Sequence, residues 1–346
     1  MKLLIALAVF FHLFVALLSA QTSVIVRANN GNPQVYPTAD LKKAFDDAAK
    51  IEGDTVWLPE VGTMYLDAAF IFDKRIHLIG VGHHPAKQSK LKGGGTYFHS
   101  ITLKGDGSSI SGIHFAGTYT LEISASKCLI TRSRIDKIFS GSGKSFMDTR
   151  ILECVVGSID LPFHSSVIIK NNILYSGDYQ NENIYIDRNS LLESNIFADT
   201  SKGGVLVSCK NSIIRNNIFL AKERNSRDLL IASSNNSIQN NLFYESQTKA
   251  FSETANSHSN NRFDIPRESF FKKFDGSDYD YQHDFHLKDG NTFIKGTDGT
   301  EVGIYGGTGW KEDMTPIVPK VVSNTTPANT EGNTLKVNIK VEAQTR

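Results

Sequence analysis

The sequence has almost no net charge. Its 37 Lys and Arg residues stand against 36 Asp and Glu residues, which gives a formal net charge of +1. Long-range attraction to nucleic acid or to an anionic membrane surface needs basic residues gathered in a patch or stripe. The sequence shows no basic stripe, so we expect no nucleic-acid partner.

Cysteine is also scarce, with only Cys128, Cys154 and Cys209. Three cysteines cannot all pair within one chain, and in an exported protein an unpaired one can be a reactive thiol. The three fall at different points of the repeat described below, where they would not stack on one another. We therefore expect three buried free thiols and no disulfide.

Long apolar runs are absent except at the start of the chain. Residues 3–18 are almost entirely apolar, and they lie between the basic Met1-Lys2 and the small pair Ser19-Ala20. This order is typical of a secretory signal peptide. The alternative is a membrane anchor, but the run is short for a span of about 20 residues. We expect residues 1–20 to be removed, and the mature protein to be secreted, extracellular or periplasmic, without a membrane span.

What the sequence does contain is a repeat in which Asn or Ser precedes an apolar pair. Clear copies are Asn171-Asn172-Ile173-Leu174, Ser194-Asn195-Ile196-Phe197, Asn216-Asn217-Ile218-Phe219 and Asn240-Asn241-Leu242-Phe243. Weaker copies begin at Ser111, Ser133, Glu153 and Asn260. The apolar anchors of the clear copies, Ile173, Ile196, Ile218 and Leu242, are 23, 22 and 24 residues apart. This irregular period indicates one coil per copy, with loops of varying length.

Further apolar residues recur at fixed offsets before the anchors. Four residues before the anchors stand Ile169, Leu192, Ile214 and Ile238, and Ile151 stands four before Val155 of the weaker copy at Glu153. Twelve residues before the four anchors stand Leu161, Ile184, Leu206 and Leu230. No apolar pattern of helical length lies between the anchors, so short parallel strands stacked coil on coil are expected. We predict two interior columns, one formed by the four anchors and one by Leu161, Ile184, Leu206 and Leu230.

The Asn pairs have two expected structural roles. Asn tolerates the left-handed backbone conformation that a sharp turn needs. Stacked in register, Asn amides can also hydrogen-bond along a ladder. A glycan-binding row of Asn side chains is the alternative interpretation.

The N-terminal end of the solenoid should be capped by a helix at residues 38–52. Apolar residues recur there at helical spacing before Gly53, which would end the helix. They are Leu41, Ala44, Phe45, Ala48 and Ile51. Residues 82–98 break the repeat and predict a protruding loop.

The C-terminal part no longer repeats. Residues 278–307 predict an irregular cap at the far end, crossed by a strand at Glu301–Tyr305. Thereafter residues 311–346 predict a linker, with a candidate edge strand at Thr334–Val341 that would lie on the solenoid. The expected organisation is a signal peptide at 1–20, one all-β solenoid with its caps at 21–310, and this tail.

These features resemble a known superfamily. The helix, Gly53–Pro59, Ile76–Gly82 and the Asn-Asn-Ile-Phe coils are similar to the pectate-lyase-like right-handed parallel β-helix proteins. The closing stretch from His286 to Gly307 resembles a C-terminal feature of exported β-helix proteins of Bacteroidetes-type bacteria. The resemblance covers about residues 25–310 and implies a right-handed parallel β-helix. It does not imply a particular activity, because fold alone does not fix function.

Many members of that superfamily bind or cleave polysaccharides, and its lyases often use Ca²⁺. The catalytic sets of its galacturonases and pectate lyases are absent here, so the sequence leaves open whether the protein is a polysaccharide lyase, a glycoside hydrolase or not an enzyme. The rival hypothesis is a non-catalytic adhesin or matrix scaffold. A Ca²⁺ site is conceivable among clustered acids, although they lack the spacing of an EF-hand loop. These acids are Asp275, Asp278, Asp280, Asp284 and Asp298.

The predicted glycan site lies at mid-solenoid, where the loops that follow the anchors lengthen. Asp187 and Arg188 are its catalytic candidates, and Tyr179, Tyr185, Lys202 and Arg224 are its substrate-binding candidates. Tyrosine offers an apolar face with a polar tip, and Arg offers a fork of donors to an acidic group. The alternatives are ordinary solvated turns and an Asp-Arg pair that closes a turn. We expect a monomer with a polysaccharide as partner.

Overall fold

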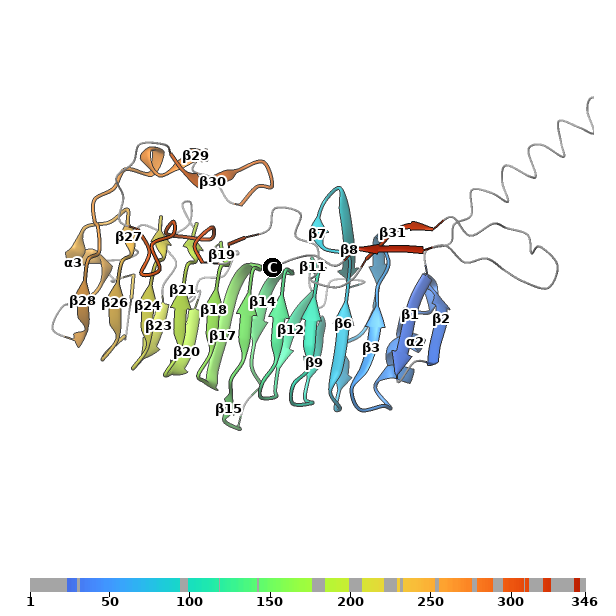
Figure 1. Ribbon diagram of the computed structural model, residues 1–346. Coiled ribbons are helices and arrows are strands. Elements are labelled where there is room, and N and C mark those ends of the chain that lie inside the picture. Colours follow the sequence, from blue (N-terminus) through green and yellow to red (C-terminus); the bar gives the residue numbers. More distant parts are fainter. Residues whose placement is uncertain are drawn as a thin grey trace, which may run out of the picture.

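The fold is a parallel β-solenoid of about eight turns. The computed structural model describes residues 24–29, 32–93, 99–117, 119–141, 143–175, 184–198, 207–220, 229–230, 233–252, 255–275, 279–288, 295–307, 309–310, 320–324 and 339–342. The predicted signal peptide lies outside these residues. Figure 1 shows the strands stacked along one axis, from the N-terminal strands in blue to the last coils in yellow.

The N-terminal cap is a hairpin followed by a helix. Strands β1 (Val24–Asn29) and β2 (Asn32–Pro37) are antiparallel, and a 3-10 turn, η1 (Thr38–Asp40), leads into α2 (Leu41–Ala48). The predicted helix is therefore confirmed, but it is shorter. Four of its five predicted apolar residues are buried, whereas Ile51 lies beyond the helix and is 38% exposed.

The first sheet has twelve strands and carries one continuous interior column. After β1 and β2 it contains β3 (Asp54–Trp57), β6 (Ile76–Ile79), β10 (Ser109–Ser111), β13 (Leu129–Thr131), β16 (Arg150–Leu152), β18 (Ile168–Lys170), β21 (Leu191–Glu193), β24 (Ile213–Arg215), β26 (Ser237–Gln239) and β28 (Ser257–Ser259). The predicted apolar positions from Ile151 to Ile238 pair in register and are fully buried. In the earlier coils Ile110 and Ile130 occupy this column.

Among the described residues the second sheet has sixteen strands, arranged in two parts together with the short hairpin strand β7 (His83–His84). One part contains β4 (Val61–Tyr65), β8 (Lys87–Lys92), β11 (Ile113–Ala116), β14 (Arg134–Phe139), β17 (Val155–Ser165), β19 (Ile173–Leu174), β22 (Ile196–Phe197), β25 (Ile218–Phe219) and β27 (Leu242–Phe243). The other contains β5 (Phe70–Phe72), β9 (His99–Leu103), β12 (Tyr119–Ile123), β15 (Phe146–Met147), β20 (Ile184–Arg188) and β23 (Val207–Lys210). The predicted loop at 82–98 is wrong in part, because β7 (His83–His84) and β8 form a hairpin and β8 is a solenoid strand.

The four anchors stack in register, but they do not face the interior of the coil. Ile173 pairs with Ile196, and Ile218 pairs with Ile196 and Leu242. Successive residues of a strand point to opposite faces. The interior positions are therefore the following residues, such as Phe197.

Those interior aromatic residues form a stack. The ring centroids of Phe197 and Phe219 are 4.2 Å apart, and those of Phe219 and Phe243 are 4.7 Å apart. The anchors instead belong to a second apolar cluster on the outside of the solenoid. The anchors therefore form a column, but it faces outward, whereas an interior column was predicted. The prediction was wrong because both residues of each pair are apolar, so the sequence does not distinguish the inward one. The weaker copies that begin at Ser133 and Glu153 are also misaligned by one residue. Their third residues, Ile135 and Val155, do not pair, because Ile135 pairs with Val156.

The second predicted column is wrong. Ile184 pairs with Ile159 and Val207, and Leu161 pairs with Ile186. Leu206 lies outside the described residues. The loops differ in length, so an offset of twelve residues does not mark the same strand position in every coil.

The Asn pairs divide their two predicted roles between their members. The first member takes the left-handed conformation, with φ of 53° at Asn171 and 59° at Asn216. The second member is buried and forms the ladder. The amide N of Asn195 donates to Asn217 Oδ1 over 2.9 Å, and the same contact joins each second Asn from Asn172 to Asn261. Both structural predictions are confirmed.

The solenoid's C-terminal segment folds back along its side. We call residues 265–310 the strap; it contains the two-stranded sheet of β29 (Phe271–Lys273) and β30 (Asp284–Leu287). Figure 1 shows the strap, in orange and red, above the yellow and green coils. Its residues Phe270, Phe285 and Ile304 cover the anchors. The prediction of a cap at the far end is therefore wrong, and residues 301–305 form turns and bends where a strand was predicted.

The far end is closed more simply. The short helix α3 (Gln247–Ala250) follows β27, and the ring of the buried Phe251 lies 5.9 Å from that of Phe243. Phe263 continues the interior stack, 5.1 Å from Phe243. Strands β31 (Lys320–Asn324) and β32 (Ile339–Glu342) pair with each other, so the described end of the predicted edge strand does not join the solenoid. In the part of the chain that the structure describes, no helix combines the length and hydrophobicity needed to cross a membrane.

All three cysteines are free and buried, as predicted. Burial raises the pKa of Cys128 and Cys154 to about 12 and that of Cys209 to about 11. A thiol reacts as its thiolate, so we expect these side chains to be unreactive in the folded protein.

Candidate functional site

Half of the predicted glycan site lies on β20, and the rest cannot be placed. Tyr179, Lys202 and Arg224 lie outside the described residues. Tyr185 is 41% exposed between the buried Ile184 and Ile186, so its side chain points outward.

The two catalytic candidates on β20 contact each other. Asp187 Oδ2 lies 2.9 Å from Arg188 Nε, and Arg188 is largely exposed. This local ion pair is the arrangement expected of a pair that closes a turn. The contact orients both side chains.

Three basic residues, Lys127, Arg188 and Lys210, lie in one interrupted row across the coils. Lys127 donates its amide to Met147, Met147 pairs with Ser165, and Arg188 pairs with Ser165 and Lys210. Two uncharged residues therefore separate Lys127 from the other bases. The row offers no continuous cationic stripe.

Tyr185 belongs to a longer row of outward side chains that the sequence did not reveal. We call it the outer row: Thr102, Glu122, Phe139, Asp160 and Tyr185 pair in register on β9, β12, β14, β17 and β20. Adjacent parallel strands lie about 4.8 Å apart. The two aromatic residues of the outer row are therefore separated by roughly 10 Å, with a carboxylate between them.

The outer row is partly held in place by its own contacts. Thr102 Oγ1 donates to Glu122 Oε2 over 3.0 Å, and Ser124 Oγ donates to Glu122 Oε1 over 2.9 Å. Lys137 Nζ lies 5.5 Å from the centre of the Phe139 ring. The result is an ordered surface of rings and hydrogen-bonding groups that is partly exposed from Glu122 to Tyr185, whereas Thr102 at its end is buried. Its members could be found only from the strand register, because unequal loops separate them in the sequence.

A pocket of about 390 Å³ lies between the strap and the β7–β8 hairpin. We call it the strap pocket. Its aromatic lining comes from the strap residues Tyr279, Tyr281, Phe285, Tyr305 and Trp310. His84, His283 and Asp284 add polar groups, and the anchor Ile173 contributes from the solenoid. This pocket could not be predicted from the sequence, because its walls meet only when the strap folds back.

Beneath the strap pocket lies a buried polar cluster. Tyr281 reaches His83, 198 residues away in sequence: its hydroxyl donates to the His83 carbonyl over 2.8 Å and lies 2.9 Å from His83 Nδ1. The Arg134 guanidinium lies 5.5 to 5.7 Å from the ring centres of Tyr175, Tyr279 and Tyr281. These contacts fix the strap against β7 and β14.

Burial controls the charge of this cluster. It lowers the pKa of His83 well below its ordinary value and that of His114 to about 3, with Arg134 adding positive charge beside both. Burial opposes the charge of Arg134, but Tyr175 and Tyr281 outweigh it and raise the pKa of Arg134. The two histidines are therefore neutral and the arginine is charged.

Polar contacts at the Asn turns hold the other part of the strap. Asn171 Nδ2 donates to the Ile304 and Gly306 carbonyls over 2.7 and 3.0 Å, and Asn216 Nδ2 donates to Thr297 Oγ1 over 3.1 Å. The first Asn of a pair thus uses its side chain to bind the strap. Gly303 of the strap, at φ +90°, lies so close to the solenoid that a Cβ at this position would be 2.7 Å from Ile218 Cδ1.

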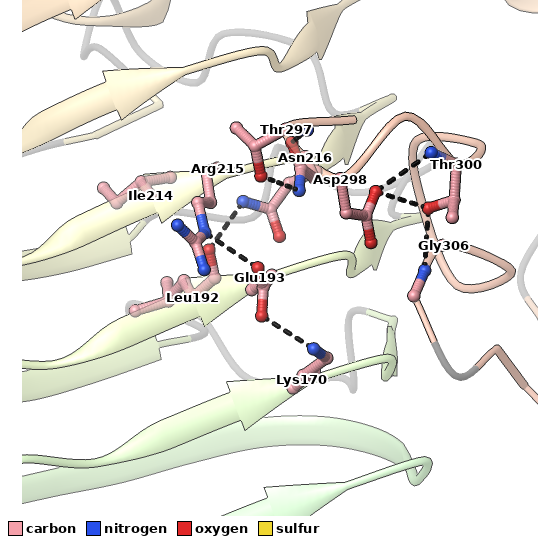
Figure 2. Close-up of polar contacts among 12 residues, drawn as sticks. Lys170, Leu192, Glu193, Ile214, Arg215, Asn216, Thr297, Asp298, Thr300 and Gly306 are labelled. Atoms are coloured by element: carbon pink, nitrogen blue, oxygen red, sulfur yellow. Dashed lines mark hydrogen bonds and ion pairs between the residues drawn. The ribbon is translucent and has the colours of Figure 1, made fainter. Parts of the chain in front are cut away.

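An ion ladder lies beside these contacts. Glu193 is buried and lies 2.8 Å from Lys170 Nζ and 2.7 Å from Arg215 Nε. Figure 2 shows Glu193 between these two bases, with Asp298 and Thr300 of the strap nearby. Hydrogen bonds from Thr300 are the main cause of the lowered pKa of Asp298, and Lys170 adds to it. The ladder stabilises the edge on which the strap rests.

The acidic residues proposed for Ca²⁺ do not converge. Asp278 lies outside the described residues, and Asp275 lies 3.2 Å from His283 Nε2. Asp280, Asp284 and Asp298 each accept a hydrogen bond from a backbone amide two residues later. Among the described residues, no group of three or more His, Cys, Asp or Glu side chains is placed to hold a metal ion.

Comparison with known proteins adds no assignment. No protein-family model matches the sequence. A search of curated proteins finds no match either.

Proposed function

We propose that the protein is an exported polysaccharide-binding protein and that the outer row is its contact surface for a glycan chain. The observation that carries the proposal is the in-register placement of Phe139 and Tyr185 two strands apart, with Glu122 and Asp160 beside them. Aromatic rings offer apolar faces to sugar rings, and carboxylates accept hydrogen bonds from hydroxyl groups.

The geometry favours a linear, uncharged chain. The row runs straight across stacked strands, so its subsites repeat at the strand spacing. Two of its five side chains are acidic, which disfavours a polyuronate at the row itself. Asp187 and Arg188 lie further along β20, where they would contact the end of such a chain.

The fold supports assignment to the superfamily that the sequence resembles. We include in the proposal membership of the pectate-lyase-like superfamily, a right-handed coil and export through the signal peptide. The parallel solenoid and the Asn ladder support the first of these. The composition of residues 1–20 supports the last.

Affinity electrophoresis against a panel of soluble polysaccharides tests the binding claim. The panel contains xylan, mannan and hydroxyethyl cellulose as neutral chains, and polygalacturonate and alginate as acidic ones. We expect retardation by at least one neutral polymer. Tyr185→Ala and Phe139→Ala should each weaken the affinity for that polymer about tenfold, because each variant loses a ring contact worth roughly 1 to 2 kcal/mol.

The control is Tyr65→Ala on β4, which removes an exposed ring (60% exposed) that is not part of the outer row. It should bind like the parent protein. The release of reducing ends from each retarding polymer shows whether cleavage accompanies binding. If no polymer retards the protein, or if both row variants bind normally, the scaffold hypothesis is the better one.

A further inference from the structure

We propose that the strap pocket is a second, independent site that binds one neutral sugar unit, free or at the end of a glycan chain. It lies on the strap side of the solenoid, where β19 contributes Ile173, whereas the outer row lies on β9 to β20. The proposal therefore does not depend on a role for the outer row.

The lining has the chemistry that sugars require. Five aromatic rings supply apolar surface for the C–H faces of a sugar ring. Asp284 accepts the His286 amide through Oδ1 over 3.0 Å, and it brings a carboxylate to the pocket. A few placed polar groups in a mainly aromatic pocket are typical of small-ligand sites.

The charge of the lining restricts the ligand. Among the described residues that line the pocket there is one acid, Asp284, and neither Lys nor Arg. A uronate or a sulfated sugar would therefore meet a carboxylate without a cationic partner. The size, about 390 Å³, is near the lower end of small-molecule pockets and suits one sugar ring, with any further unit of a chain outside the pocket.

The walls are formed before any ligand binds. Tyr281 is held by two contacts to His83. Tyr305 stacks on His286 with ring centroids 3.6 Å apart and an interplanar angle of 10°. Asn171 holds the carbonyl of Ile304 over 2.7 Å. A preformed wall lowers the cost of ordering on binding, so single-residue changes in the lining should act directly on affinity.

The fluorescence of Trp310 gives a local readout. The chain has two tryptophans, and the other one, Trp57, lies on β3 in the first coil. In a Trp57→Phe background all tryptophan emission comes from Trp310. The full chain is titrated with glucose, galactose, mannose, cellobiose, lactose and maltose, and separately with glucuronate and galacturonate.

We expect a saturable change with at least one neutral sugar and a weaker one, or none, with both uronates. Asp284→Asn keeps the acceptor for the His286 amide but removes the charge, and Tyr305→Ala removes one ring. Each should weaken binding about tenfold or more. Tyr65→Ala, the matched ring deletion elsewhere, and Tyr185→Ala on the outer row should bind normally. Thermal unfolding of each variant checks that it is folded.

Two results would overturn the proposal. One is the absence of a saturable response to every neutral sugar up to tens of millimolar. The other is unchanged affinity in both lining variants while they remain folded. If the uronates bind as tightly as the neutral sugars, the assignment of a neutral ligand is wrong. Loss of polymer retardation in Tyr185→Ala with normal sugar binding would confirm that the two sites are separate.

Discussion

Replacing one ladder asparagine should destabilise the protein far more than replacing its neighbour. Asn195 is fully buried; its Oδ1 accepts the Asn172 amide over 2.9 Å, and its Nδ2 donates to the Ile169 carbonyl over 2.9 Å. Asn195→Ala leaves the Asn172 amide and the Ile169 carbonyl without this partner. A buried polar group left unsatisfied costs about 1 to 3 kcal/mol, so two such groups give a loss of roughly 2 to 6 kcal/mol in the free energy of unfolding.

Ser194→Ala is the matched control. Ser194 is the preceding residue, is also buried and has φ of 56°, so it shares the backbone strain of this turn. No ladder contact passes through its side chain, and its replacement should cost less than about 1 kcal/mol.

Urea unfolding followed by far-ultraviolet circular dichroism measures both variants. The midpoint should fall strongly in Asn195→Ala and only slightly in Ser194→Ala, with similar slopes. Equal losses in the two variants would refute the division of roles within the Asn pairs.

Three more outcomes follow from the buried groups. Phe197→Ala should cost about 3 to 5 kcal/mol because it opens a cavity in the interior stack, and the midpoint of urea unfolding measures this; a loss below 1 kcal/mol would argue that Phe197 does not face inward. Acid should destabilise the protein, because the pKa of His114 is about 3 in the folded state against 6.5 in the unfolded state. Below about pH 6.5 only the unfolded state takes up this proton, so the free energy of unfolding falls by up to about 2 kcal/mol at pH 5. His114→Gln should reduce this pH dependence in thermal unfolding from pH 5 to pH 8, and an unchanged dependence would contradict the assignment. All three cysteines should react with a maleimide in denaturant and none in native solution, as read by intact mass.

The solenoid could be predicted from the sequence because each coil repeats the same physical demands. A sharp turn needs a left-handed residue, a buried amide ladder needs Asn, and the adjacent column from Ile151 to Ile238 needs apolar side chains. These demands leave a recognisable pattern even when loop lengths vary. The capping helix was predictable for the same reason, from Leu41, Ala44 and Phe45 at helical spacing.

The direction of the Ile-Phe pairs could not be predicted. Alternation separates inside from outside only when one member of a pair is polar. Here Ile196 and Phe197 are both apolar, because the strap covers the outer one. The second apolar layer is the signal that a further segment packs there, but the sequence does not say which segment it is.

The strap pocket and the outer row were missed for a related reason. His83 and Tyr281 meet across 198 residues, and no local pattern predicts such a contact. Glu122, Phe139, Asp160 and Tyr185 share a row only once the strand register is known. The predicted site therefore contained Tyr185 but not the other members of its row.

The dependence of affinity on chain length tests the central claim most directly. The outer row spans five strands, or four steps of about 4.8 Å, which is about 19 Å in total. For oligosaccharides of the polymer that retards the protein, affinity measured by calorimetry should rise with each added sugar until the chain spans the row, at about four units, and then level off. A single affinity for all lengths from the disaccharide upward, or no binding at any length, would contradict the account.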